Sequence, residues 1–177
     1  MKKFVVLLVL ALAPAFGTSL AQAQDSASET GGMMINQGDL EVGGSGNFYR
    51  RNQGDYWKLN INPKVEYFFL NRFSAGARVN FSDSNVDPTE FQAGPSATYY
   101  FAIVRNIALY VDQAVLWTNP PGNADNYIYG ETGIGADFFI RPNIAVGPSL
   151  RGIYYFNADT GLPPGGTDIR INISTFF

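Results

Sequence analysis

The chain has 177 residues and a formal net charge of −3, and it contains neither cysteine nor histidine. Without cysteine there can be no disulfide, thiol nucleophile or lipoprotein anchor. Without histidine the commonest general base and metal ligand are missing, as is every Ser-His or Asp-His catalytic arrangement. The mildly acidic balance, with no basic stripe, argues against nucleic acid as a partner.

The first 23 residues have the features of a secretory signal peptide. Lys2 and Lys3 form a basic start, the apolar run "FVVLLVLALAPAFG" follows, and "AQA" supplies small residues for cleavage. We expect cleavage after Ala23, which removes two lysines and no acid and leaves a formal charge of about −5. Residues 24–37 are small and polar without a period, and we expect a flexible periplasmic lead-in there.

From residue 38 onward the sequence alternates between apolar and polar residues, as strands do. Charged and aromatic residues each make up 15% of the chain, and this composition is too apolar for a disordered protein. After the signal peptide, no apolar run is long enough for a membrane-spanning helix. Several short strands without helical periodicity indicate an all-β sandwich or barrel. The expected strands are residues 39–50, 56–69, 72–82, 89–101, 106–117, 126–140, 143–157 and 168–177.

The connections between these segments alternate between tight and longer ones. Residues 70–71, 102–105 and 141–142 are tight, whereas the intervening connections are rich in Gly, Pro, Asn and Asp. In an up-and-down meander every second turn lies at the same end. Short turns at one end and longer loops at the other are typical of an outer-membrane barrel. The sequence therefore predicts an eight-stranded antiparallel up-and-down transmembrane β-barrel over residues 38–177.

Three prolines fall inside segments that should be fully paired, although proline removes a ladder hydrogen bond. These are Pro63, Pro95 and Pro148, and we expect bulges where Gly94 and Gly147 precede two of them. Gln113 falls on the lipid-facing side of the fifth segment, so the register near "DQA" stays open.

The apolar rows of the segments begin and end with aromatic residues. A membrane barrel places such aromatic girdles at both interfaces, because amphipathic rings favour the headgroup level. The predicted outer girdle consists of Trp57, Phe81, Phe91 and Trp117, and the periplasmic one of Tyr67, Phe69, Phe73, Phe101, Ile140 and Phe177.

The opposite rows carry acids and bases in near balance. Eight strands leave an interior just wide enough for side chains to fill it, and buried charges there must be paired. We expect a lumenal charge network, with a proton or ion path as the functional alternative. Its expected members are Glu41, Lys58, Lys64, Glu66, Arg78, Glu90, Asp112, Glu131, Asp137, Arg151 and Arg170.

The final segment, "DIRINISTFF", alternates up to Phe177. An unpaired strand of this kind would be an aggregation hazard, so we expect it to pair with the first segment and close the sheet. A terminal Phe on the lipid-facing row also resembles the signal that outer-membrane barrels present to the barrel-assembly machinery.

The chain from residue 38 onward resembles the small eight-stranded outer-membrane β-barrel proteins of Gram-negative bacteria. The theme P-x-x-x-Y-[FY]-F, at Pro63 to Phe69 and Pro95 to Phe101, is similar to that of short outer-membrane β-barrel domain proteins. Enzymes known in such barrels depend on histidine, which this chain lacks. The scaffold specifies architecture well and activity poorly, because many functions share it.

These observations predict a non-enzymatic outer-membrane protein with a polar, side-chain-filled lumen and a structural or interaction role at the cell surface. The alternative is a narrow channel or transporter for ions or small solutes. A carboxylate-based enzyme and a soluble lipocalin-like barrel are weaker alternatives. No cofactor or metal is expected. The expected partners are outer-membrane lipid, lipopolysaccharide and the assembly machinery, and a monomer is expected.

Overall fold

The computed structural model describes residues 35–50, 56–86, 89–104, 106–118, 127–156 and 165–177. The predicted signal peptide and most of the predicted lead-in lie outside these residues. Within this part of the chain there is no helix long and apolar enough to cross a membrane.

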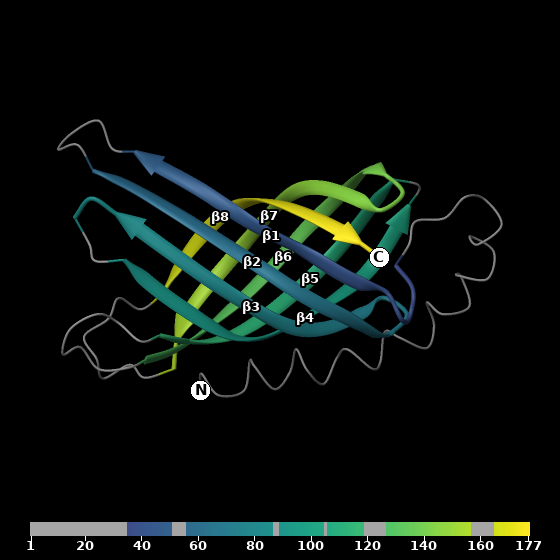
Figure 1. Cartoon of the computed structure of the whole chain (residues 1–177), viewed down its shortest axis with the longest axis horizontal. Coiled ribbons are helices and arrows are strands. Elements are labelled where there is room, and N and C mark those ends of the chain that lie inside the picture. The colour runs from purple at the N-terminus through teal and green to yellow at the C-terminus, as the bar shows by residue number, and fades with distance from the viewer. Residues whose placement is uncertain (1–34, 51–55, 87–88, 105, 119–126, 157–164) are drawn as a thin grey trace. The chain divides into compact units, whose positions relative to one another are not determined.

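The described residues form one closed antiparallel barrel in which each strand pairs with its sequence neighbours (Figure 1). The predicted eight-stranded up-and-down barrel is thereby confirmed, with strand ends within two or three residues of those expected. The strands are β1 (Leu40–Arg50), β2 (Trp57–Leu70), β3 (Phe73–Ser84), β4 (Glu90–Val104), β5 (Ile107–Thr118), β6 (Tyr127–Arg141), β7 (Ile144–Tyr155) and β8 (Gly166–Phe176).

The last strand closes the sheet, as predicted. β8 pairs with β1 from Glu41 opposite Phe176 to Gly46 opposite Ile171. Beyond these pairs, the Leu40 N–H donates to the Phe177 carbonyl at 3.0 Å and the Phe177 N–H donates to the Leu40 carbonyl at 2.9 Å. Neither β1 nor β8 therefore presents a free edge along this stretch.

The bulges lie beside the tight turns, so the prediction of bulges at the Gly-Pro pairs was wrong. The register shifts between Phe68 and Leu70, between Tyr100 and Ala102, and between Phe139 and Arg141. In the hairpin between β2 and β3, Arg72 has a φ of 69°, the left-handed conformation that follows a type I turn and accompanies a bulge. The turn geometry, rather than proline, places the extra residue.

At each proline the ladder is interrupted on one side without a change of register. Pro95 pairs with Ala77 of β3, while its pairing with β5 lapses and resumes at Ser96. Pro148 behaves in the same way, pairing with Ile171 of β8. Proline removes a donor but inserts no residue, so the strands continue in register. The register of β5 is likewise continuous past Gln113, a position at which the sequence leaves the register open.

The glycine before Pro148 lies where the neighbouring strand comes closest. A Cβ atom on Gly147 would overlap the backbone carbonyl of Ala136, whereas one on Gly166 would meet nothing within 4 Å. We expect Gly147→Ala to lower the free energy of unfolding by about 1–3 kcal/mol, because backbone cannot yield as a side chain can. Gly166→Ala, the matched control, should leave it unchanged or slightly higher. Denaturant unfolding in lipid vesicles measures both, and equal values would contradict the close approach.

The apolar row of every strand faces outward. Large apolar side chains are well exposed along it, among them Ile169 at 70%, Ile140 at 67% and Phe177 at 64%. The polar rows face the lumen, where charged side chains are almost completely buried. The interior of the protein is therefore polar and its surface apolar, the reverse of a soluble barrel.

Candidate functional site in the barrel lumen

Five charged side chains from five strands meet in the middle of the lumen. The Glu131 carboxylate, on β6, lies 2.9 Å from the Arg170 guanidinium and 3.4 Å from that of Arg78. The Asp112 carboxylate, on β5, lies 2.8 Å from the Arg151 guanidinium. Arg78 also pairs directly with Asp112, so the two acids share its guanidinium. All five side chains are at most 4% exposed. Each side chain thus has at least one partner of opposite charge, and Asp168, which pairs with Arg170 at 2.7 Å, supplies the third acid for the three arginines. We call these five residues the central network.

A glycine makes the pairing of Asp112 with Arg151 possible. Gly133 lies between them in the ladder, opposite Asp112 on one side and Arg151 on the other. A Cβ at this position would overlap the Asp112 carboxylate and lie 3.3 Å from an Arg151 guanidinium nitrogen. The missing side chain leaves the space through which the acid and the base meet.

A second ionic cluster, nearer the tight turns, is centred on Lys64. Its ammonium lies 2.8 Å from Glu41 and 3.6 Å from Glu66. Hydroxyl groups donate to all four carboxylate oxygens. Ser174 and Ser74 donate to the oxygens that face Lys64, at 2.7 Å for Glu41 and 2.8 Å for Glu66. Tyr100 and Ser96 donate to the other two, at 3.3 Å for Glu41 and 2.5 Å for Glu66. Lumenal serines therefore complete the ion pairs, as buried polar groups demand.

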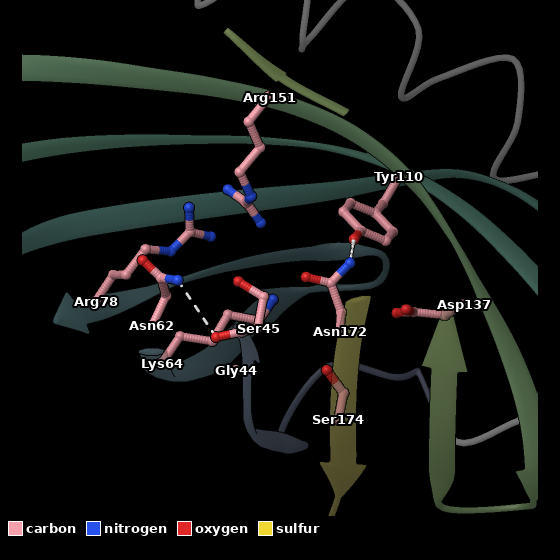
Figure 2. Close-up of a pocket in the computed structure, with 10 residues that line it drawn as sticks. All are labelled: Gly44, Ser45, Asn62, Lys64, Arg78, Tyr110, Asp137, Arg151, Asn172 and Ser174. Carbon is pink, nitrogen blue, oxygen red and sulfur yellow. Dashed lines mark hydrogen bonds between the residues drawn. The ribbon is translucent and has the colours of Figure 1, made fainter. Parts of the chain in front are cut away.

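Asp137 stands apart from both clusters. Among the described residues, no cation lies within ion-pair distance of its carboxylate, which accepts a hydrogen bond from Tyr100 at 3.3 Å. Asp137 borders a cavity of about 10 Å³, beside Tyr110 and Asn172, which are joined by a hydrogen bond of 2.7 Å (Figure 2). Such a volume holds about one water molecule. It is too small for a continuous aqueous path.

Four aromatic side chains close the lumen at the end with the tight turns. Phe68, Tyr100, Phe139 and Phe176 are at most 7% exposed. Their ring centroids are 5.9 Å apart for Phe68 and Tyr100, and 5.3 Å apart for Phe139 and Phe176. Phe176 also approaches Phe68, at 6.2 Å. We call these four residues the aromatic plug.

The backbone of each plug residue is anchored at the same end of the barrel. The Tyr100, Phe139 and Phe176 N–H groups donate to the carbonyls of Arg72, Asn106 and Asn143, at 2.9, 2.7 and 2.9 Å. These acceptors lie in the tight turns just before β3, β5 and β7. The plug residues that donate to them lie on the strands that follow, β4, β6 and β8. The bulges described above fall directly after three plug residues, so turn, bulge and plug form one repeated unit.

A larger cavity of about 290 Å³ lies on the other side of the central network. Its lining includes Lys58 and Glu90, which are not part of the central network of five charged side chains. The Tyr127 hydroxyl donates to Glu90. This cavity, which we call the vestibule, is nearest the strand ends that carry the longer connections. From the end with the longer connections to the end with the tight turns, the lumen therefore contains the vestibule, then the ion pairs, and then the packed aromatic rings.

The structure places nine of the eleven predicted lumenal charges in the buried interior and two, Lys58 and Glu90, on the vestibule wall. The predicted girdle residues all lie on outward rows; Trp57, Phe73 and Phe101 are half-buried there. Phe177 is exposed, with its backbone paired to Leu40. The prediction omitted Asp168, which accepts from Arg170 at 2.7 Å, and the aromatic plug. The sequence does carry a signal for the plug: in β2, β4, β6 and β8 the polar, inward-facing row ends in an aromatic residue next to a tight turn or the C-terminus.

Comparison with known proteins supports the fold and leaves activity open. A scan of protein-family models and a search of curated proteins find no match to the sequence. Among solved structures, the N-terminal β-barrel domain of OprF from Pseudomonas aeruginosa matches with a TM-score of 0.61 at 13% identity, over 80% of this chain and 98% of that one. Neisserial surface protein A matches with a TM-score of 0.56 at 12% identity, over 78% of this chain and 96% of that one.

The fold is therefore that of the small eight-stranded outer-membrane β-barrels, and the expected resemblance is confirmed at the level of fold. The interior of this chain combines a filled lumen with a vestibule at one end.

Proposed function

We propose that this protein is a non-enzymatic outer-membrane barrel, sealed by its own side chains, with a structural or interaction role at the cell surface. The observation that carries the proposal is the double closure of the lumen. The central network and the aromatic plug block it in succession, and the cavity between them holds about one water molecule.

The absence of enzymatic activity is supported by the residues available. The chain has no histidine or cysteine, and the central lumenal acids are engaged in ion pairs that fix their charge. The outer membrane is supported by the apolar exterior and by the fold. Export through a cleaved signal peptide, contacts with outer-membrane lipid and lipopolysaccharide, recognition of Phe177 by the assembly machinery, and a monomeric state belong to the same proposal.

Conductance of the refolded mature protein in a planar bilayer tests the sealed lumen. A difference in gel migration between boiled and unboiled samples first establishes that the barrel is folded. We expect folded protein to give no discrete conductance steps. Steps that change when Glu131 or Arg151 is neutralised would instead make the lumen a channel, the alternative function.

The lipid-facing exterior is tested by one arginine placed at two heights on β8. Ile171 lies in the middle of the strand on the outward row, and Thr167 lies near its beginning on the same row. We expect Ile171→Arg to lower the free energy of unfolding in vesicles by about 2–4 kcal/mol, and Thr167→Arg by about 1 kcal/mol or less. A charge at mid-height meets hydrocarbon, whereas one near the interface reaches water. Equal small losses would place the barrel in an aqueous environment.

A further inference from the structure

The vestibule has two chemically different walls, which adjoin where β7 pairs with β8. On β6 and β7, Tyr127, Tyr155 and Ile153 pack against the buried residues Ala114, Leu116 and Tyr129. The ring centroids of Tyr127 and Tyr155 are 5.6 Å apart. Because they rest on a packed layer, these rings form a firm apolar surface that borders the cavity.

The second wall, on β1, β2 and β8, consists of planar polar groups joined by hydrogen bonds. The Asn60 amide donates to Asn47 and the Asn47 amide donates to Asp168, both at 2.6 Å, and Asp168 accepts from Arg170 at 2.7 Å. All four residues border the vestibule. The chain fixes the orientation of each amide, so their remaining donors and acceptors are preorganised.

One buried acceptor at the base of the vestibule lacks a partner. The Asn80 amide nitrogen donates to Glu131 at 3.1 Å, but its oxygen has no hydrogen-bond partner among the described residues. Asn80 is only 6% exposed and borders the cavity. Because this oxygen has almost no accessible surface, a water or a ligand hydroxyl in the vestibule reaches it only when the Asn80 side chain shifts.

The charges of the vestibule argue for a neutral ligand. Arg170 is neutralised by Asp168 and Glu131. The other charged groups that border the vestibule are one cation and one anion. They are the Lys58 ammonium, which pairs with no carboxylate of the described residues, and the Glu90 carboxylate. A formally charged ligand would unbalance this arrangement. The cavity of about 290 Å³ is at the small end of ligand sites, which begin at about 300 Å³.

We propose that the vestibule binds one neutral sugar ring. The apolar C–H face of a pyranose stacks on the ring of Tyr155, and the Tyr127 ring, inclined at 63° to it, contacts the edge of the sugar. The equatorial hydroxyl groups meet the amides of Asn47 and Asn60. A shift of the Asn80 side chain would let a further hydroxyl donate to its oxygen. The sugar is either a free monosaccharide or the terminal unit of a surface glycan. The sealed lumen beneath the vestibule makes this a binding cup, and the proposal stands independently of whether the barrel conducts.

Saturation-transfer NMR on the folded protein tests this assignment. The protein is held in nanodiscs or a zwitterionic detergent, because sugar-headed detergents would occupy the site. Glucose, galactose and N-acetylglucosamine are titrated, with glycerol and inorganic phosphate as controls. We expect saturable binding of at least one sugar and none of glycerol or phosphate. Tighter binding of an oligosaccharide ending in that sugar would identify a glycan as the source, and equal or weaker binding a free sugar.

Two adjacent tyrosines give a matched pair of variants. Tyr155 borders the vestibule, whereas Tyr154 lies on the outward row and accepts a hydrogen bond from Gln113 at 2.8 Å. We expect Tyr155→Ala to weaken sugar binding about tenfold or more and Tyr154→Ala to leave it unchanged. Asn60→Ala, which removes a polar contact and keeps the rings, should weaken it as well. Absence of saturable sugar binding, binding indifferent to Tyr155, or preference for phosphate would each overturn the proposal.

Discussion

Replacing Glu131 with glutamine is expected to lower the free energy of unfolding by about 3–5 kcal/mol. Glu131 is the acid on which Arg170 and Arg78 converge, at 2.9 and 3.4 Å, and it is 1% exposed. Its neutralisation leaves three central arginines with Asp112 as the only central acid, in a space where water cannot take over the charge. Denaturant unfolding in lipid vesicles, followed by tryptophan fluorescence, measures the loss.

Glu90→Gln is the matched control for this change. Glu90 is half-buried on the vestibule wall and accepts a hydrogen bond from Tyr127. The same substitution there should lower the free energy of unfolding by about 1 kcal/mol or less. A double variant, Glu131→Gln with Arg170→Gln, should lose less than the sum of its single variants, because the two charges depend on each other. Similar losses for Glu131→Gln and Glu90→Gln would show that the central network contributes nothing special.

Phe68→Ala is expected to lower the free energy of unfolding by about 3–5 kcal/mol as well, for a different reason. Phe68 is fully buried in the aromatic plug, against Tyr100 and Phe176. Its removal leaves a cavity among rings whose backbones are tied to the turns, so the plug cannot collapse into the space. The next residue on the strand, Phe69, faces outward and is 53% exposed.

Phe69→Ala is therefore the control for Phe68→Ala, with the same chemistry on the opposite face. It should produce a clearly smaller loss, because lipid fills the space that the ring leaves. Phe68→Ala should also remain non-conducting, since the central network still seals the lumen above the plug. Conductance from this variant alone would mean that the rings, rather than the ion pairs, form the seal. Equal losses from the two variants would contradict the plug.

The alternation of the sequence predicts the strands because a strand with one lipid face and one lumenal face must alternate at every position. This is why the eight segments, the closure by β8 and the inward direction of Arg78, Asp112 and Glu131 follow from the sequence alone. Lipid leaves no freedom in the phase of a strand: a slip of one residue would place arginine in hydrocarbon.

The partners of those side chains could not be predicted, because they depend on height along the barrel and on neighbouring small residues. Gly133 permits the contact between Asp112 and Arg151, a role that no strand pattern encodes. The bulges were misplaced because proline is the obvious irregularity in the sequence, whereas the turns determine where a residue must be inserted. Phe68 and Phe176 interrupt polar rows, but their common height becomes evident only after the sheet has closed.

The location of the arginines also constrains the route by which the chain reaches its membrane. Before β8 pairs with β1, the inward rows have no enclosed lumen, and Arg78, Arg151 and Arg170 would meet lipid in any open sheet that had already inserted. Each would cost about 2–4 kcal/mol at mid-depth, or on the order of 6–12 kcal/mol together. Insertion and closure must therefore advance together, with the charges shielded by their partners, by water or by another protein until the seam is complete.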